Sequence, residues 1–108
     1  MEGINMVKDL TDATFEQETA TGVTFTDFWA TWCGPCRMQS PVVEQLAEEM
    51  GDKVNFNKVD VDQNQETAAK FGIMSIPTML IKKDGQVVES IVGYHSKEQL
   101  EAKLAPYI

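Results

Sequence analysis

The chain has 108 residues, of which 43% are hydrophobic, and 17 acidic against 9 basic residues give it a net charge of −8. This length predicts one domain over residues 1–108, with a hydrophobic core that needs no metal or disulfide to hold it together. The basic residues form no cluster and no apolar run is long enough to cross a membrane. We therefore expect neither nucleic acid nor a membrane as a partner.

Residues 1–9 lack the basic start and the apolar stretch of a signal peptide. We therefore expect a cytoplasmic protein, in a compartment where thiols are kept reduced. This expectation affects how the only two cysteines are interpreted, because lasting structural disulfides are rare there.

The hydrophobic pattern predicts strands and helices that alternate along most of the chain. Strands are expected over residues 7–10, 23–29, 54–61, 78–82 and 87–92, and helices over residues 15–19, 36–50, 63–71 and 97–105. This order predicts an α/β fold, with a central mixed and mainly parallel sheet of about five strands flanked by about four helices.

Local signals support several of these elements. Thr11 or Asp12 is the expected cap of the first helix. Residues 23–29 carry apolar side chains on both faces, which predicts a strand in the middle of the sheet. Asp84-Gly85 predicts a hairpin turn, and Ser96 with Gln99 predicts a capping box for the last helix.

The helix that follows the cysteines is expected to bury one face. Apolar residues recur on that face at helical spacing, namely Val42, Val43, Leu46, Ala47 and Met50. Pro41 lies inside the helix and predicts a kink, and Gly51 predicts its end.

Cys33 and Cys36 allow three interpretations. A structural disulfide would close so short a loop that it stabilises by only roughly 2 kcal/mol, and a reducing compartment would undo it. A tetrahedral zinc site needs two further ligands, but the chain has no other cysteine and His95 is its only histidine.

The third interpretation, redox catalysis, fits the pattern best. A Cys-x-x-Cys pair after a strand and at the start of a helix is typical of thiol-disulfide exchange. The spacing lets the second sulfur attack a mixed disulfide on the first, and the helix N-terminus stabilises a thiolate. Gly34 leaves the first sulfur uncrowded, and Pro35 suits the first helical turn.

The motif around these cysteines resembles the active-site signature of the thioredoxin family. The resemblance extends over residues 27–37, which contain Trp-Cys-Gly-Pro-Cys, and includes the distant Ile76-Pro77-Thr78 and Gly93. It covers essentially the whole chain, in the right order, and implies the thioredoxin fold.

The position of the cysteines and the resemblance together assign the exchange reaction. Cys33, nearer the helix start and expected to be the more exposed, attacks the client disulfide, and the more buried Cys36 resolves the mixed disulfide. Asp27 lies on an apolar strand face, so burial should raise its pKa and let it help to deprotonate Cys36. Lys58 resembles a family lysine that tunes this acid. The alternatives are a carboxylate bound to nearby backbone and a surface lysine.

The resemblance also implies a client-binding surface around the active sulfur. Its residues are Trp32, Gly34, Pro35, Ile76, Pro77 and Gly93. A cis bond before Pro77 is implied by the family alone, since most X–Pro bonds are trans. Ser75 and Tyr94 depart from the family pattern beside this surface, and Gln39 departs from it within the helix. His95 is expected to be a solvated loop residue.

The leading hypothesis is a monomeric, general protein-disulfide reductase with no cofactor or metal beyond the Cys33–Cys36 pair. The chain has no nucleotide-binding motif, so its electrons must come from a partner, by resemblance an NADPH-dependent flavoprotein, thioredoxin reductase. Its clients are proteins with reducible disulfides. A disulfide isomerase or oxidase of the same fold and a binding module with incidental cysteines remain as alternatives.

Overall fold

The structure is a computed structural model that describes residues 6–108. The expectation about a signal peptide concerns residues 1–9, of which residues 1–5 lie outside the described part. The described residues form a sheet in the order β1-β3-β2-β4-β5. Its strands are β1 (Val7–Asp9), β2 (Val23–Trp29), β3 (Asn55–Asp60), β4 (Thr78–Lys83) and β5 (Gln86–Val92).

The sheet is mixed, with β2 in the middle as predicted. β3 runs parallel to β1 and β2, whereas β4 is antiparallel to both β2 and β5. The expected mainly parallel character therefore holds for only one half of the sheet. The connection from β3 to β4 contains only a short helix, α3 (Gln65–Lys70), so β4 starts at the end of the sheet where β3 stops.

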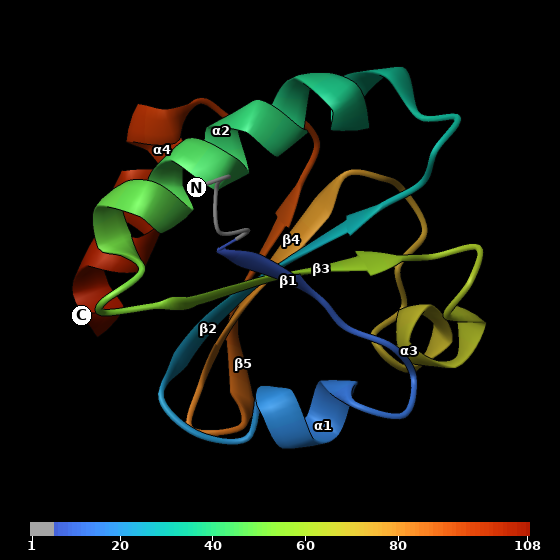
Figure 1. Cartoon of the computed structure of the whole chain (residues 1–108), viewed down its shortest axis with the longest axis horizontal. Coiled ribbons are helices and arrows are strands. Elements are labelled where there is room, and N and C mark those ends of the chain that lie inside the picture. The colour runs from blue at the N-terminus through green and yellow to red at the C-terminus, as the bar shows by residue number, and fades with distance from the viewer. Residues whose placement is uncertain (1–5) are drawn as a thin grey trace, which may run out of the picture.

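Helices cover both faces of the sheet (Figure 1). Helices α2 (Gly34–Met50) and α4 (Lys97–Leu104) lie on one face, and α1 (Phe15–Glu18) and α3 lie on the other. A short 3-10 turn, Ala105–Tyr107, follows α4. This layered arrangement is the thioredoxin fold that the sequence predicts, with the predicted order of elements.

Each face of the sheet has its own buried cluster. Under α2 and α4 the cluster includes Phe25, Phe56, Leu46, Met79, Ile81 and Leu100. Under α1 and α3 it consists of Leu10, Phe15, Phe28, Val59 and Leu80. Burying a side chain of this size contributes about 1.5–3 kcal/mol, so both layers hold β2 in place.

The predicted cap of α1 is wrong. Thr14 is the residue before the helix and makes no side-chain cap, while the Asp12 carboxylate reaches α3 instead. It accepts hydrogen bonds from the backbone N–H of Glu66 and Thr67 and from the Thr67 hydroxyl. The reason is tertiary: the chain after β1 passes beside the start of α3, where N–H groups lack partners within the helix.

Helix α2 buries a face that differs in part from the predicted one. Val43, Leu46 and Ala47 are buried as expected, but Val42 and Met50 are only half-buried. Gln39, a polar residue outside the predicted face, is fully buried.

The end of the chain follows the prediction. Ser96 and Gln99 form the predicted capping box at the start of α4.

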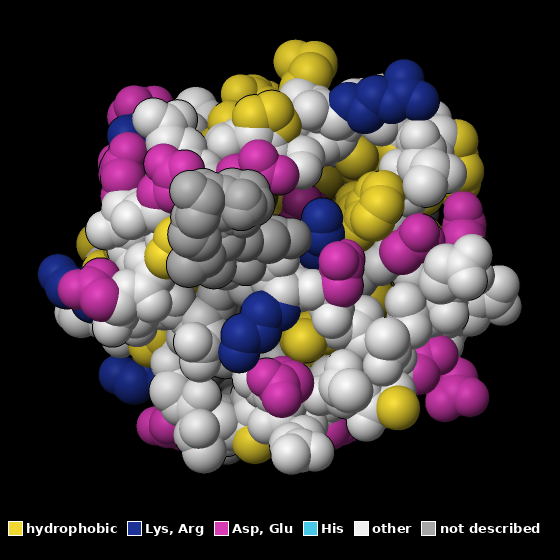
Figure 2. Space-filling view, viewed as in Figure 1, with side chains coloured by type: hydrophobic (Ala, Val, Ile, Leu, Met, Phe, Trp, Pro, Cys, Tyr) yellow, Lys and Arg dark blue, Asp and Glu magenta, His cyan; other side chains and the backbone are white. Residues whose placement is uncertain are grey.

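Within residues 6–108, no helix combines the length and hydropathy needed to cross a membrane. On the face in Figure 2, Lys and Arg side chains lie apart from one another among Asp and Glu.

Candidate active site

Cys33 and Cys36 are joined in a disulfide at the start of α2. Their Cα atoms are 5.3 Å apart, within the range found for disulfides. Cys33 occupies the N-cap position, and its Sγ accepts a hydrogen bond from the Cys36 N–H at 3.2 Å. Pro35 lies in the first turn, where its missing N–H leaves no helical bond unmade.

The position of Cys33 favours its thiolate. Once the disulfide is opened, the same N–H and the positive end of the α2 dipole face the Cys33 sulfur. Both favour negative charge on a sulfur at this position.

The expected difference in exposure between the cysteines is wrong for this oxidised state. Cys33 is 4% exposed and Cys36 3%. The disulfide draws the two sulfurs together under Ile76 and Trp29, so their neighbours distinguish them rather than their exposure. Cys33 Sγ lies 3.7 Å from the Ile76 carbonyl oxygen, whereas Cys36 lines a hollow on the other side.

That hollow connects Cys36 with Asp27. It has a volume of about 310 Å³ and is lined by Asp27, Trp29, Ala30, Thr31, Cys36, Arg37, Ser40 and Lys58. Asp27 is 3% exposed, and its Oδ1 is buried without a hydrogen-bond partner among the described residues. The hollow has room for water, which can carry a proton between Asp27 and the second cysteine.

Burial raises the pKa of Asp27 to about 7, although the nearby Lys58 charge opposes the shift. The cause is the loss of water around a carboxylate on an apolar surface. The pKa expected from the sequence is therefore confirmed in direction, and the group can exchange a proton near neutral pH.

Lys58 lies directly opposite Asp27, on the neighbouring strand β3. Its Nζ is 3.9 Å from an Asp9 carboxylate oxygen and 5.6 Å from the centre of the Trp29 ring. Its side chain is 25% exposed, so Lys58 is half-buried.

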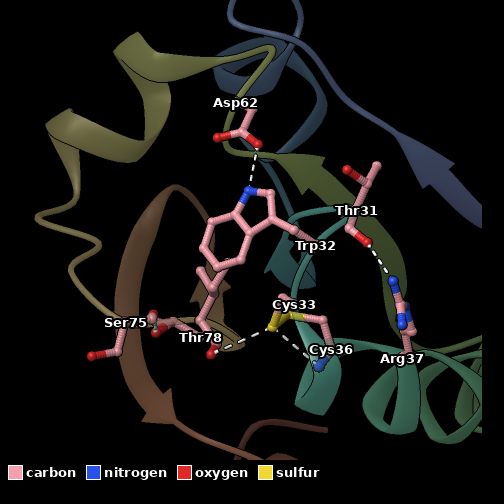
Figure 3. Close-up of a disulfide and its surroundings, with 9 residues drawn as sticks. Thr31, Trp32, Cys33, Cys36, Arg37, Asp62, Ser75 and Thr78 are labelled. Atoms are coloured by element: carbon pink, nitrogen blue, oxygen red, sulfur yellow. Dashed lines mark hydrogen bonds between the residues drawn. A yellow bond between two sulfur atoms is a disulfide. The ribbon is translucent and has the colours of Figure 1, made fainter.

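The residues predicted to bind clients lie around Cys33. Trp32 is 66% exposed, and its indole N–H donates to Asp62 at 2.8 Å (Figure 3). The bond between Ile76 and Pro77 is cis, as the resemblance implies. Gly93 donates its N–H to the Pro77 carbonyl at 2.8 Å and has a φ of +90°, which favours glycine.

Exposed apolar residues extend this surface beyond the predicted set. Met74 is almost fully exposed beside Ser75, and Val92 and Tyr94 flank Gly93. In the sequence, the signal for Met74 is an apolar residue in a loop just before the Ile-Pro-Thr motif. We call Trp32, Met74, Ile76, Val92, Gly93 and Tyr94 the docking face.

Two residues near the docking face, His95 and Gln39, make contacts that the sequence did not predict. His95 is half-buried, and its backbone N–H and carbonyl both bond to the Gln39 side chain. Its ring Nδ1 lies 2.8 Å from the Gly93 carbonyl. The expectation of a solvated loop histidine therefore holds only in part, because His95 is half-buried and a buried amide from α2 holds its backbone.

No group of three or more His, Cys, Asp or Glu side chains in residues 6–108 is arranged to hold an ion.

Comparison with known proteins gives a consistent result. The family model described as Thioredoxin matches residues 6–106. A thioredoxin of Listeria monocytogenes is 60% identical over 103 residues, which is 95% of this chain and 100% of the relative. A thioredoxin of Bacillus subtilis is 59% identical over 84% of this chain and 88% of its own, and one of Staphylococcus aureus is 48% identical over 92% and 95%.

Proposed function

The chain belongs to the thioredoxin family and reduces protein disulfides by thiol-disulfide exchange, and we propose that Cys33 attacks, Cys36 resolves and Asp27 handles the proton. One observation supports this order above the others. Cys33 Sγ, not Cys36 Sγ, caps α2 and receives a backbone N–H. This supports assigning the attacking thiolate to Cys33 once the disulfide is opened.

The reaction has two exchange steps. The Cys33 thiolate attacks one sulfur of the client disulfide, and the other client sulfur leaves as a thiolate that takes up a proton. The Cys36 thiolate then attacks Cys33 Sγ in the mixed disulfide, and the second client sulfur leaves in the same way. Two electrons pass to the client, and the Cys33–Cys36 disulfide remains.

Asp27 acts in the second step. Cys36 must lose its proton before it attacks, and the Asp27 carboxylate across the hollow accepts that proton, directly or through water. A pKa of about 7 suits this role, because the group is then ionised in part of the molecules and exchanges protons readily at neutral pH. Lys58 acts through Asp27, since its charge keeps the carboxyl pKa from rising further.

The docking face receives the client chain. Trp32 and Ile76 offer apolar contact beside the sulfur, and the Ile76 carbonyl, 3.7 Å from Cys33 Sγ, can accept a backbone N–H from an extended client. Gly34 has no atom within 4 Å of the place where a side chain would begin, so it and Pro35 leave the approach to Cys33 open. Pro77 and Gly93 hold this part of the surface together through their hydrogen bond.

The oxidised pair must be reduced again by a partner. We assign this step to a separate NADPH-dependent flavoprotein, thioredoxin reductase, and place the protein as a monomer in the cytoplasm. A chain with only two cysteines suits a reducing compartment, which supports the cytoplasm. The exposed docking face supports a monomer, because a permanent dimer contact at this face would cover it. Clients are proteins whose disulfides must be reduced, and no cofactor is assigned beyond the cysteine pair.

Insulin reduction with dithiothreitol as electron source tests the proposal, with the unaltered protein compared with Cys33→Ser and Cys36→Ser. We expect fast turnover that both substitutions abolish, while only Cys36→Ser accumulates a mixed disulfide with the client, because its Cys33 can attack but nothing resolves. Trapping by Cys33→Ser instead would reverse the two roles. Turnover no faster than with dithiothreitol alone would favour a binding module of the same fold.

A further inference from the structure

Gln39 is a fully buried polar side chain one turn after Cys36 on α2. Its Nε2–H donates to the His95 carbonyl at 3.0 Å, and its Oε1 accepts the His95 N–H at 2.8 Å. We call this pair of hydrogen bonds the Gln39 latch. It joins the helix that carries both cysteines to the loop that follows β5.

The latch continues into the docking face through further hydrogen bonds. His95 Nδ1 lies 2.8 Å from the Gly93 carbonyl, and the Gly93 N–H donates to the Pro77 carbonyl at 2.8 Å. Pro77 follows Ile76, whose carbonyl oxygen lies 3.7 Å from Cys33 Sγ. The latch therefore ties the loop around Tyr94 to α2. The His95–Gly93 bond lies within that loop, and the Gly93 N–H ties the loop to the segment beside the active sulfur.

A buried amide at this position destabilises the protein unless its polar atoms form hydrogen bonds. A buried amide without partners loses about 1–3 kcal/mol of hydration, whereas an apolar side chain of similar volume would fill the space without that cost. Gln39 recovers the cost only because both of its polar atoms bond to the same backbone residue, His95. Two bonds to one residue also fix the direction in which the loop leaves β5.

We propose that Gln39 is a positioning residue that holds Gly93 and Tyr94 at a set place relative to Cys33 and thereby determines affinity for protein clients. The inference rests on the proposed docking face. It assigns Gln39 no part in the exchange chemistry, since its side chain bonds to His95 and not to a sulfur. Loss of the latch should therefore affect large clients, which contact the loop, and spare small disulfides, which contact only the sulfur.

The test is Gln39→Met, which keeps the length and approximate volume of the side chain and removes both bonds. We expect the KM for insulin to rise roughly three- to tenfold, the effect of losing about one hydrogen bond of positioning. The rate with the small disulfide 5,5′-dithiobis(2-nitrobenzoic acid) should stay within about twofold, because the sulfur chemistry is unchanged.

Val43→Ala is the matched control. Val43 lies one turn further along the same buried face of α2 and leaves a cavity when shortened, but its side chain has no polar atom to bond to the loop. It should lower the free energy of unfolding and leave the KM for insulin unchanged. An equal rise of KM in both variants would attribute the effect to lost stability and overturn the proposal.

Two further results would overturn it. An unchanged KM for insulin in Gln39→Met would show that the latch does not set client affinity, and an equal loss with both substrates would show that Gln39 acts on the cysteines.

If Gln39→Met does not fold, amide exchange in the unaltered protein tests the latch instead. The His95 amide should exchange slowly although it lies outside the strands and helices, and exchange at the rate of a free amide would refute the latch. Failure of the unaltered protein to reduce insulin would instead contradict the proposed function.

Discussion

Asp27 and Lys58 lie opposite each other on β2 and β3, and the Lys58 charge affects the ionisation of Asp27. Asp27 has lost its hydration, which raises its pKa, and the Lys58 charge limits that rise. The rate at which Cys36 resolves a mixed disulfide should therefore follow the ionisation of Asp27, and Lys58 should set the pH at which this occurs.

Replacing Lys58 by Met is predicted to move the pH dependence of insulin reduction to higher pH. Without the lysine charge the Asp27 pKa rises above about 7, so a smaller fraction of the carboxyl is ionised at neutral pH and turnover there falls. Steady-state rates measured across the neutral range give the midpoint. Asp27→Asn is the control, because it should slow turnover and remove that inflection altogether. If Lys58→Met leaves the midpoint of the pH dependence unchanged, Lys58 does not affect the ionisation of Asp27.

Single residues differed in how far the sequence could predict them. Asp27 was found because alternation along residues 23–29 places a carboxyl on an apolar face, a purely local pattern. Gln39 and Lys82 were missed because their partners come from distant parts of the chain. Lys82 is buried between Thr19, whose hydroxyl accepts from Nζ at 2.9 Å, and the Phe15 ring, 5.1 Å away. Both partners lie too far from Lys82 in the sequence for a local pattern to indicate these contacts.

At the scale of elements, α3 depends on a residue that is not part of it. The helix is short, and its first N–H groups bond to the Asp12 carboxylate from the segment after β1. These bonds hold the Asp12 pKa below its usual range, the Thr67 hydroxyl being the largest cause. The carboxylate therefore ties α3, and with it the chain leading to Met74 and Ile76, to the edge of the sheet.

Asp12→Ala is predicted to destabilise the protein more at neutral pH than in acid. Because the folded-state pKa is lowered, the stabilisation is present above the unfolded-state pKa and is lost as the pH falls through the lower folded-state value. The free energy of unfolding in urea, measured at about pH 7 and about pH 3, should differ more between the two chains at the higher pH. Asp12→Asn keeps an oxygen acceptor and serves as the control. A loss of equal size at both values would rule out the charge as its source.

The existence and order of the elements followed from local pattern, whereas their edges and pairings did not. Ser96 and Gln99 predicted the start of α4 because a capping box is contained within four residues. The direction of β4 was not predictable in this way. It depends on the path of the connection between β3 and β4, in which α3 is short. The cis bond before Pro77 came from family resemblance alone, because the local sequence favours trans.

At the scale of the whole molecule, the acid that serves the reaction lowers stability. A group whose pKa is raised by folding binds its proton more tightly in the folded state, so folding is favoured where that proton is bound. For Asp27 the contribution is fully present below about pH 3.8 and is lost as the pH rises to about 7. Above that value the folded chain contains a buried carboxylate.

Asp27→Asn is therefore predicted to stabilise the oxidised protein at alkaline pH. The shift from 3.8 to about 7 corresponds to an upper limit of roughly 4 kcal/mol in the free energy of unfolding. Denaturation in guanidinium at about pH 8 and about pH 4 should show a gain at the first value that shrinks toward the second. A variant less stable than the parent at pH 8 would mean that the carboxylate has a partner that offsets its burial.

The two ends of the sheet differ in content. Cys33, Ile76 and Gly93 lie at the end where β2 stops and β4 begins, while the Asp84-Gly85 turn lies at the other, beside the start of β2. β2 alone has seven residues, which at about 3.3 Å each separate the ends by roughly 20 Å. Lys83, exposed next to the turn, therefore offers an attachment point for coupling the protein to a resin or an electrode. Molecules fixed there would all present their sulfurs to the solution, so a coated surface would keep its reducing capacity.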